Sequence, residues 1–352
     1  MNALGPVNTV MGAVDRWQRR NRWAGVPYAV VKKFGDDKAN LVVVALAWYG
    51  FTAIFPLLLV VVTLFGFIGA ESLGTGIVHT LQKFPVIGTN FQDTGGLHGS
   101  VFGLIVGLVG LVYGAQGVTQ TAQEAMATVW NIPQFERTGF LPRLGRSLAG
   151  LITIGAAFVI NAFVTTYATG AAHNYAIRIP VLAGLLALNV GLYFASFTLL
   201  TAKVIGPRGH LPGAIAGAVA FTALITVGTG LVNHQLKNAN ETYGTFGTVI
   251  GIVLFLLLLA KLTLYAAELN PVLARRLYPR ALPLGGEPTD ADRQVLASLV
   301  HAQQRSEDET IRVGFADQAP DQAASDAARH AIPEQPQSSH DKEQQPSSHD
   351  KP

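Results

Sequence analysis

The chain has 352 residues, of which 49% are hydrophobic and 13% are charged, and its formal net charge is +3. This composition is too apolar for an ordinary soluble domain and is typical of a membrane protein. No cysteine is present, which excludes disulfides, thiolate metal sites and cysteine nucleophiles. Basic residues prevail in residues 1–280 and acidic residues in residues 281–352. We interpret the positive charge as a signature of topology and lipid contact, not of nucleic-acid binding.

Residues 1–40 form a basic, amphipathic arm that we expect to be cytoplasmic. Val7, Val10, Val14 and Trp17 recur at helical spacing, and several arginines occupy the opposite, polar side. A basic helix with aromatic residues is typical of a helix that lies on a membrane surface. The alternative is an ordinary helix that packs against the rest of the protein.

Six hydrophobic stretches follow the arm. About 20 apolar residues are enough to cross the hydrocarbon core of a bilayer as a helix. The predicted membrane-spanning segments are residues 41–70, 100–117, 147–169, 181–204, 212–232 and 246–270, with a polar connection at 118–146 and a short hairpin at 233–245. The fold prediction is therefore an all-α membrane protein with a six-helix transmembrane domain over residues 41–280.

The distribution of lysine and arginine orients these segments. Cytoplasmic loops of membrane proteins carry an excess of both residues. With six spans, the arm, the second and fourth loops and the segment after the last span share one side, which holds fifteen basic residues. The first, third and fifth loops together hold three. We therefore predict that both termini are cytoplasmic.

Glycine spacing predicts close packing between helices. A Gly-x-x-x-Gly pattern lets two helix backbones approach closely in a membrane. The pattern occurs in the second and fifth segments, at Gly99, Gly103 and Gly107, at Gly110 and Gly114, and at Gly213 and Gly217. We expect tight packing there, either within one chain or between chains, because the sequence does not give the oligomeric state.

Pro56 interrupts the first segment. Because proline has no N–H, the carbonyl of Thr52 loses its helical donor, and a kink or local opening is expected. In a membrane such a carbonyl must face protein or water. The opening therefore either lines a cavity or is closed by packing.

Lys261 lies near the middle of the last segment. An ionisable group in hydrocarbon is expensive and is a functional-site candidate by default. Its partner would be a carbonyl near Pro56, Asn161 or Asn189, or an anionic group of a substrate. The alternative is a lysine that reaches the interface or a water pocket and serves stability alone.

Glu268 lies near the end of the same segment. It follows Lys261 by seven residues, which places the two on one helix face but about 10 Å apart along the axis. The two are therefore too distant to pair directly. Because Glu268 is close to the cytoplasmic end, beside Arg275 and Arg276, a structural ion pair or cap is the expected role.

The composition changes after residue 280. Thr289-Asp-Ala-Asp292 is typical of a helix start, with an N-cap and early acidic residues, so residues 281–302 are predicted to hold a short cytoplasmic helix. Residues 303–352 are rich in Gln, Ser, Asp and Pro and are predicted to form a disordered acidic tail.

Familiar catalytic signatures are missing from the sequence. It contains no phosphate-binding G-x-x-x-x-G-K-[ST] motif, no H-E-x-x-H zinc motif and no G-x-S-x-G nucleophile motif. We therefore expect neither an enzyme nor a bound metal or cofactor.

Three stretches carry a resemblance through their order and spacing. The first is Ala47–Leu59, with an aromatic pair followed by Phe-Pro-Leu-Leu; the second is Gly114–Gly117 followed by Ala125–Pro133. The third joins Tyr243-Gly244 to Tyr265-Ala-Ala-Glu-Leu-Asn270. Together they resemble the YihY / virulence factor BrkB family of bacterial inner-membrane proteins, and are most similar to its actinobacterial, YhjD-like branch. Lys261 departs from the family, which usually has an apolar residue there.

The resemblance implies six helices in the bacterial cytoplasmic membrane and no established biochemical activity. Family members have been linked to envelope integrity, serum resistance and lipid or glycolipid export, and some carry a ribonuclease label that these residues do not support. We expect a transporter or flippase-like exporter of a lipid-linked or amphipathic envelope component, with membrane lipids as partners. The alternatives are a non-transporting membrane scaffold and, disfavoured, an enzyme. Residues assigned to a substrate path or structural motif are Tyr49, Pro56, Asn161, Asn189, Tyr243, Gly244, Lys261, Glu268 and Asn270.

Overall fold

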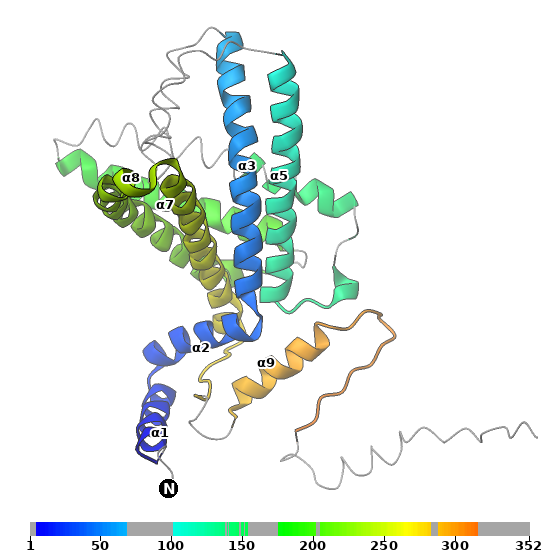
Figure 1. Ribbon diagram of the computed structural model, residues 1–352. Coiled ribbons are helices and arrows are strands. Elements are labelled where there is room, and N and C mark those ends of the chain that lie inside the picture. Colours follow the sequence, from blue (N-terminus) through cyan, green and yellow to red (C-terminus); the bar gives the residue numbers. More distant parts are fainter. Residues whose placement is uncertain are drawn as a thin grey trace, which may run out of the picture. The chain divides into compact units, whose positions relative to one another are not determined.

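The computed structural model describes residues 5–68, 101–137, 139, 141–147, 149–150, 152–153, 175–201, 205–282 and 288–315. Within these ranges every regular element is helical, as the fold prediction requires (Figure 1). The elements are α1 (Gly5–Arg20), α2 (Arg22–Asp36), α3 (Ala39–Ile68), α5 (Val101–Val129), the 3-10 turn η1 (Gln134–Glu136), α7 (Tyr175–Leu200), α8 (Pro207–Ala274) and α9 (Asp290–His301). Most of the predicted third span, including Asn161, lies outside the described residues, as does the tail beyond residue 315.

Two compact units divide the chain, Met1–Thr310 and Ile311–Pro352. The first contains all the helices named above. Of the second, only residues 311–315 are described, and they have no regular secondary structure.

The basic arm consists of two helices, α1 and α2, which are separated at Asn21. The amphipathicity of α1 is the reverse of that of an ordinary surface helix. Its polar residues Asp15 and Gln18 are buried, whereas Val14 and Trp17 are exposed, Trp17 by 58%. Trp23, at the start of α2, is 94% exposed. Helix α1 therefore packs against the rest of the protein through its polar side, whereas Val14 and Trp17 remain exposed.

Helices α3 and α5 run side by side, as Figure 1 shows, and glycines of α5 bring them together. A Cβ added to Gly114 would lie 2.9 Å from the Cα of Ala53, and one added to Gly117 would lie 2.2 Å from the Tyr49 ring. Small residues at a membrane interface allow such backbone approach. Gly110 and Gly114, two glycines of the predicted pattern, thus pack against α3 within one chain.

Pro56 lies inside α3, which continues as a helix to Ile68. Its ring faces Gly110 of α5, where an added Cβ would be 3.0 Å from the Pro56 Cγ. The glycine leaves room for the ring between the two helices. The described contact of Pro56 is thus packing against α5.

Helix α5 ends at Val129, which corrects the predicted polar connection that began at residue 118. Its last three turns remain helical because their polar side chains are buried with partners. The Thr119 hydroxyl donates to the carbonyl of Ala115 over 2.9 Å, and the Gln123 amide donates to Ser147 Oγ over 2.9 Å. Composition alone suggested a loop, whereas a local hydrogen bond of Thr119 and a hydrogen bond from Gln123 to another segment keep these groups inside a helix.

Helix α8 contains both the fifth and the sixth predicted spans. The backbone N–H of Gly213 donates to Asn270 Oδ1 over 2.7 Å, although 57 positions separate the two residues. A straight helix rises about 1.5 Å per residue and would place them about 85 Å apart. The chain therefore reverses direction within α8. The first and second halves of this helix, called the two arms of α8 to distinguish them from the N-terminal arm, lie against each other. Figure 1 shows the change of direction near the α8 label.

The outer surfaces of the long helices are apolar. On α8 the exposed residues Ile250, Leu254 and Leu258 form one stripe at four-residue spacing. Among the described residues, three stretches are long and apolar enough to cross a membrane, Leu104–Val129, Ile179–Leu200 and Val249–Ala274, and Ala39–Ile54 is a shorter apolar stretch. Apolar faces that remain exposed on this scale are typical of surfaces that face lipid. The count of six spans stays a prediction.

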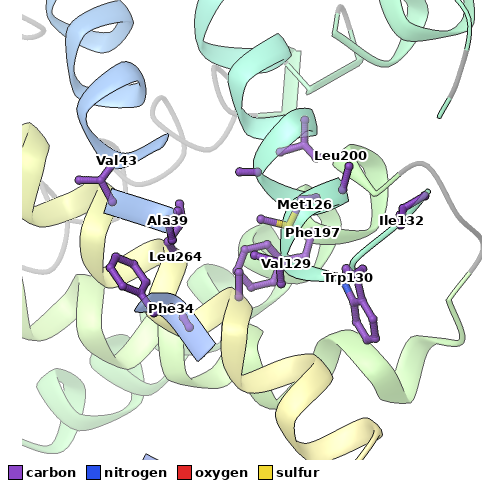
Figure 2. Close-up of a cluster of buried hydrophobic side chains, with 14 of the residues drawn as sticks. Phe34, Ala39, Val43, Met126, Val129, Trp130, Ile132, Phe197, Leu200 and Leu264 are labelled. Atoms are coloured by element: carbon purple, nitrogen blue, oxygen red, sulfur yellow. The ribbon is translucent and has the colours of Figure 1, made fainter. Parts of the chain in front are cut away.

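The hydrophobic core lies where the arm meets the ends of the long helices (Figure 2). It combines Phe34 of α2, Val129 and the following Trp130, Phe197 of α7 and Leu264 of α8. The Phe34 ring stacks on Tyr265 with centroids 4.2 Å apart. Burying large aromatic and aliphatic side chains fixes the end of α2 against α5 and α8.

Close contact between the two arms of α8 predicts a severe effect of Gly213→Ala. The added Cβ would lie 2.3 Å from the carbonyl oxygen of Ala266, which is backbone and cannot rotate away. We expect a loss of about 3 kcal/mol, the upper range for overpacking, measured as thermal unfolding in detergent. Gly191→Ala on α7 is the control, because no described atom lies within 4 Å of its added Cβ. Equal losses in both variants would contradict the packing of the two arms.

Candidate functional sites: two buried charge clusters and an apolar cavity

Three fully buried ionisable side chains form an inner cluster of Lys33, Asp37 and Glu268. The Lys33 ammonium donates to Asp37 Oδ2 over 2.5 Å, to Glu268 Oε2 over 2.9 Å and to the carbonyl of Val129 over 2.8 Å. All three N–H donors of the lysine are thereby satisfied. The cluster joins the end of α2, the end of α5 and the last turns of α8.

The environment of the inner cluster shifts the pKa values of Lys33 in α2 and of Asp37, the residue that caps the C-terminal end of α2. Burial opposes the charged form of Lys33, but the neighbouring carboxylates of Glu268 and Asp37 outweigh burial and hold the pKa of Lys33 above its ordinary value. Burial also raises the pKa of Asp37, against the opposing effect of Lys33. The lysine therefore stays charged at neutral pH.

An outer cluster of Lys32, Asp36, Arg280 and Asp292 lies beside the inner one. Arg280 donates from Nε to Asp292 Oδ1 over 2.5 Å and from Nη2 to Asp36 Oδ2 over 2.7 Å. Lys32 donates to the same Asp292 oxygen over 2.7 Å. Asp292 also accepts the backbone N–H of Ala281 over 2.8 Å. The outer cluster therefore ties α2 to the chain after α8 and to α9.

The segment after α8 is held to the arm by its backbone as well. Asp15 accepts the N–H of Leu282 over 3.0 Å, and Tyr28 donates to the carbonyl of Ala281 over 3.2 Å. Gln18 donates to the carbonyl of Arg280. The hydrogen bonds of Asp15 and Gln18 to this segment explain why the polar side of α1, and not its apolar side, is buried.

Helix α9 begins with a capping box at the residues that the sequence marks. The backbone N–H of Asp292 donates to the Thr289 side chain, and the Asp292 carboxylate accepts the N–H of Thr289 over 2.9 Å. Burial alone would disfavour the Asp292 charge, but hydrogen bonds from Lys32 and Arg280 outweigh it and hold the pKa of Asp292 well below its ordinary value. Asp292 is thus the common acceptor of the outer cluster.

A cavity of about 310 Å³ lies among α3, α5, α7 and both arms of α8. Most of its walls are aliphatic or aromatic, including Leu46, Met126 and Leu256. The polar lining comes from Asn189, Tyr193 and Ser196 on α7 and Thr263 on α8. The Tyr193 hydroxyl and the Thr263 hydroxyl are 3.2 Å apart and hydrogen bonded. A mostly apolar cavity with few polar groups is typical of a site for a hydrophobic or amphipathic ligand.

The predicted site residues are distributed over several places. Asn189 lies in the cavity wall, whereas Tyr49 and Pro56 lie at the α3–α5 contact. Half-buried Lys261 is not among the residues that line the cavity. Asn270 is buried at the contact between the arms of α8. Tyr243 and Gly244 belong to α8, but their side-chain environments are outside the described part, as is Asn161.

Glu268 has a partner that the sequence did not indicate. The sequence favoured an ion pair or cap beside Arg275 and Arg276, but the described ion pair of Glu268 is with Lys33 of α2. Arg275 instead donates to the carbonyl of Trp130 over 2.8 Å and lies 5.7 Å from the centroid of that ring.

Of the seven residues in the two clusters, only Glu268 was predicted as a site residue; the other six are Lys32, Lys33, Asp36, Asp37, Arg280 and Asp292. The lysines and arginines were counted only as topology signals. One local signal was present, because Lys33 and Asp37 are four residues apart and share a helix face. Their burial depends on Glu268 of α8, which lies 235 positions after Lys33 along the chain.

Removing the charge of Lys33 tests the inner cluster. Lys33→Met leaves two buried carboxyl groups without their cation, and breaking a buried pair from one side costs about 3–5 kcal/mol. We expect that loss in detergent unfolding. Lys38→Met, at an exposed position five residues further on, should change the unfolding free energy by less than about 0.5 kcal/mol. A similar small change in Lys33→Met would show that the cluster contributes little.

Asp292→Asn tests the outer cluster through its pH dependence. An acid whose pKa is lowered by folding stabilises the folded state at pH values above the ordinary pKa of that acid. For an aspartate this stabilisation is lost as the pH falls below about 4. Wild type should exceed Asp292→Asn by about 2 kcal/mol at pH 7, and the difference should shrink below pH 4. Asp290→Asn, at an exposed position on the same turn, is the control. A difference in unfolding free energy between wild type and Asp292→Asn that does not change with pH would contradict this role of Asp292.

Comparison with known proteins agrees with the resemblance described for the sequence. Residues 30–289 match the family model described as Virulence factor BrkB, and this range includes the whole inner cluster. No curated protein and no solved structure matches the chain. Since the family match covers well over half of the chain, this integral membrane protein belongs to the virulence factor BrkB family.

Proposed function

We propose that the protein binds an amphipathic lipid or lipid-linked envelope component and moves it between leaflets of the bacterial cytoplasmic membrane. The observation that carries this proposal is the cavity of about 310 Å³ lined by helices from four parts of the chain. Its size is at the lower end for ligand sites. It therefore suits one portion of a lipid, such as part of an acyl chain, rather than a whole molecule.

The polar groups of the cavity favour an amphipathic ligand over a purely apolar one. Asn189, Tyr193 and Ser196 follow one another at four- and three-residue spacing, so they share one face of α7. Thr263 faces this strip through its hydrogen bond to Tyr193. A strip of neutral hydrogen-bonding groups in an apolar wall offers transient partners to hydroxyl, amide or ester groups without binding an ion tightly.

The arm supports contact with the cytoplasmic leaflet. Its exposed Trp17 and Trp23 are accompanied by the exposed basic residues Arg16, Arg20 and Arg22. Tryptophan favours the membrane interface, and basic residues favour the anionic cytoplasmic surface. Because the polar face of α1 is occupied by the segment after α8, the apolar face is free to enter the headgroup region. This supports both termini being cytoplasmic.

Narrowing the cavity tests the proposal. Purified wild-type protein in liposomes should accelerate leaflet exchange of fluorescent phospholipids above protein-free liposomes. Ala260→Phe places a ring in the cavity wall and should reduce exchange at least about tenfold, since it removes the space that the ligand needs. Ala187→Phe makes the same change at an exposed position of α7 and should leave exchange near the wild-type rate.

The scaffold alternative gives a different result. If wild type accelerates the exchange of neither phospholipids nor extracted envelope glycolipids, the cavity does not translocate lipid and a non-transporting role is favoured. Equal exchange by wild type and Ala260→Phe would remove the cavity from the path. Folding of both variants is checked by their elution and unfolding temperature in detergent.

A further inference from the structure

The inner cluster contains one more acid than base. Asp37 and Glu268 surround a single ammonium, that of Lys33, and none of the three side chains is exposed. With both carboxyl groups ionised the cluster would carry one negative charge in the protein interior. An uncompensated buried charge is costly, and such groups take up or release protons instead.

The geometry leaves one oxygen of each carboxyl group without a donor. Lys33 binds Asp37 Oδ2 and Glu268 Oε2, whereas Asp37 Oδ1 and Glu268 Oε1 are buried and have no hydrogen-bond partner among the described residues. Both carboxyl groups bind the same ammonium, over 2.5 Å and 2.9 Å, so the two bound oxygens are separated by no more than the sum of these distances. Two ionised carboxylates have only acceptors, so a bond between them requires a proton on one.

Other charges around the cluster do not provide the missing donor. On α2, Asp36 is engaged by Arg280. After α8, Arg275 acts on Asp37 through space, but its described hydrogen bond goes to the carbonyl of Trp130. From α5 the cluster receives only the carbonyl of Val129, which is an acceptor. None of these described groups donates to Asp37 Oδ1 or Glu268 Oε1, whereas a proton on one carboxyl group would supply a donor.

We propose that Asp37 and Glu268 form a proton-binding site that holds one shared proton while α2 is docked against α8. The proton removes the excess charge and bridges the two carboxyl groups. Because one carboxyl group belongs to each element, proton binding and docking stabilise each other. This inference does not rest on lipid translocation; it adds a second bound species, the proton, at a site separate from the residues that line the cavity.

The pH dependence follows from the proton that the folded cluster is proposed to hold. A shared proton corresponds to an acid that is protonated above its ordinary range when folded. Its stabilisation is complete below the unfolded pKa of about 4 and is lost as the pH rises through the folded value of the pair. This is opposite in sign to the contribution of Asp292, so the two can be separated in one titration series.

Infrared spectroscopy of the full-length protein in lipid nanodiscs tests the site directly. The difference spectrum of wild type minus Glu268→Gln at pH 7 should contain the carbonyl band of one protonated carboxyl group. The difference of wild type minus Asp37→Asn should contain the same band, because either change leaves a single ionised acid beside Lys33. Asp290→Asn, at an exposed position, should give no such band. Absence of the band in both cluster differences overturns the proposal.

Stability provides the second readout. Glu268→Gln has the shape of the protonated residue and cannot lose its proton, so it should fold and should lack the loss of unfolding temperature that wild type shows as the pH rises. Failure of this variant to fold, in conditions where wild type folds, also contradicts the proposal. Lipid exchange enters neither measurement, so this site and the translocation function fail or succeed separately.

Discussion

The placement of one ammonium group in the protein interior governs how the described helices come together. Lys33 is completely buried, and its three donors reach α2, the end of α5 and α8. In a low-dielectric interior these bonds are strong, and an unpaired member is expensive. The end of α2 can therefore occupy its place only when both α5 and α8 are in theirs.

Around this contact, the segment that precedes the transmembrane region and the segment that follows it form one layer. The outer cluster connects α2 to Arg280 and to Asp292 of α9, and the backbone of residues 280–282 is bonded to the arm. The family match runs from residue 30 to residue 289 and so includes most of this layer together with the long helices. The arm and the segment after α8 are thus integral parts of the fold rather than appendages to the spans.

The sequence predicts the class of the fold well because hydrocarbon imposes simple rules on length and polarity. It also locates the N-cap at Thr289 and the close packing at Gly114, where local chemistry decides the structure. It places the end of α5 too early, because Gln123 is polar but buried through a partner on another segment. The sequence could not predict the partner of Glu268 for the same reason, because a contact between residues 235 positions apart leaves no periodic signal in the sequence.

That separation has a consequence for the synthesis of the protein. Lys33 and Asp37 emerge from the ribosome long before Glu268. While Glu268 is missing, the cost of removing their charges from water is not compensated. The arm therefore stays hydrated during insertion of the earlier helices and docks only after the last turns of α8 have been made. A chain that stops short of residue 268 would display an exposed, charged arm and an open helix end, which are features that quality-control proteases act on. The cluster thereby links completion of the chain to closure of the fold.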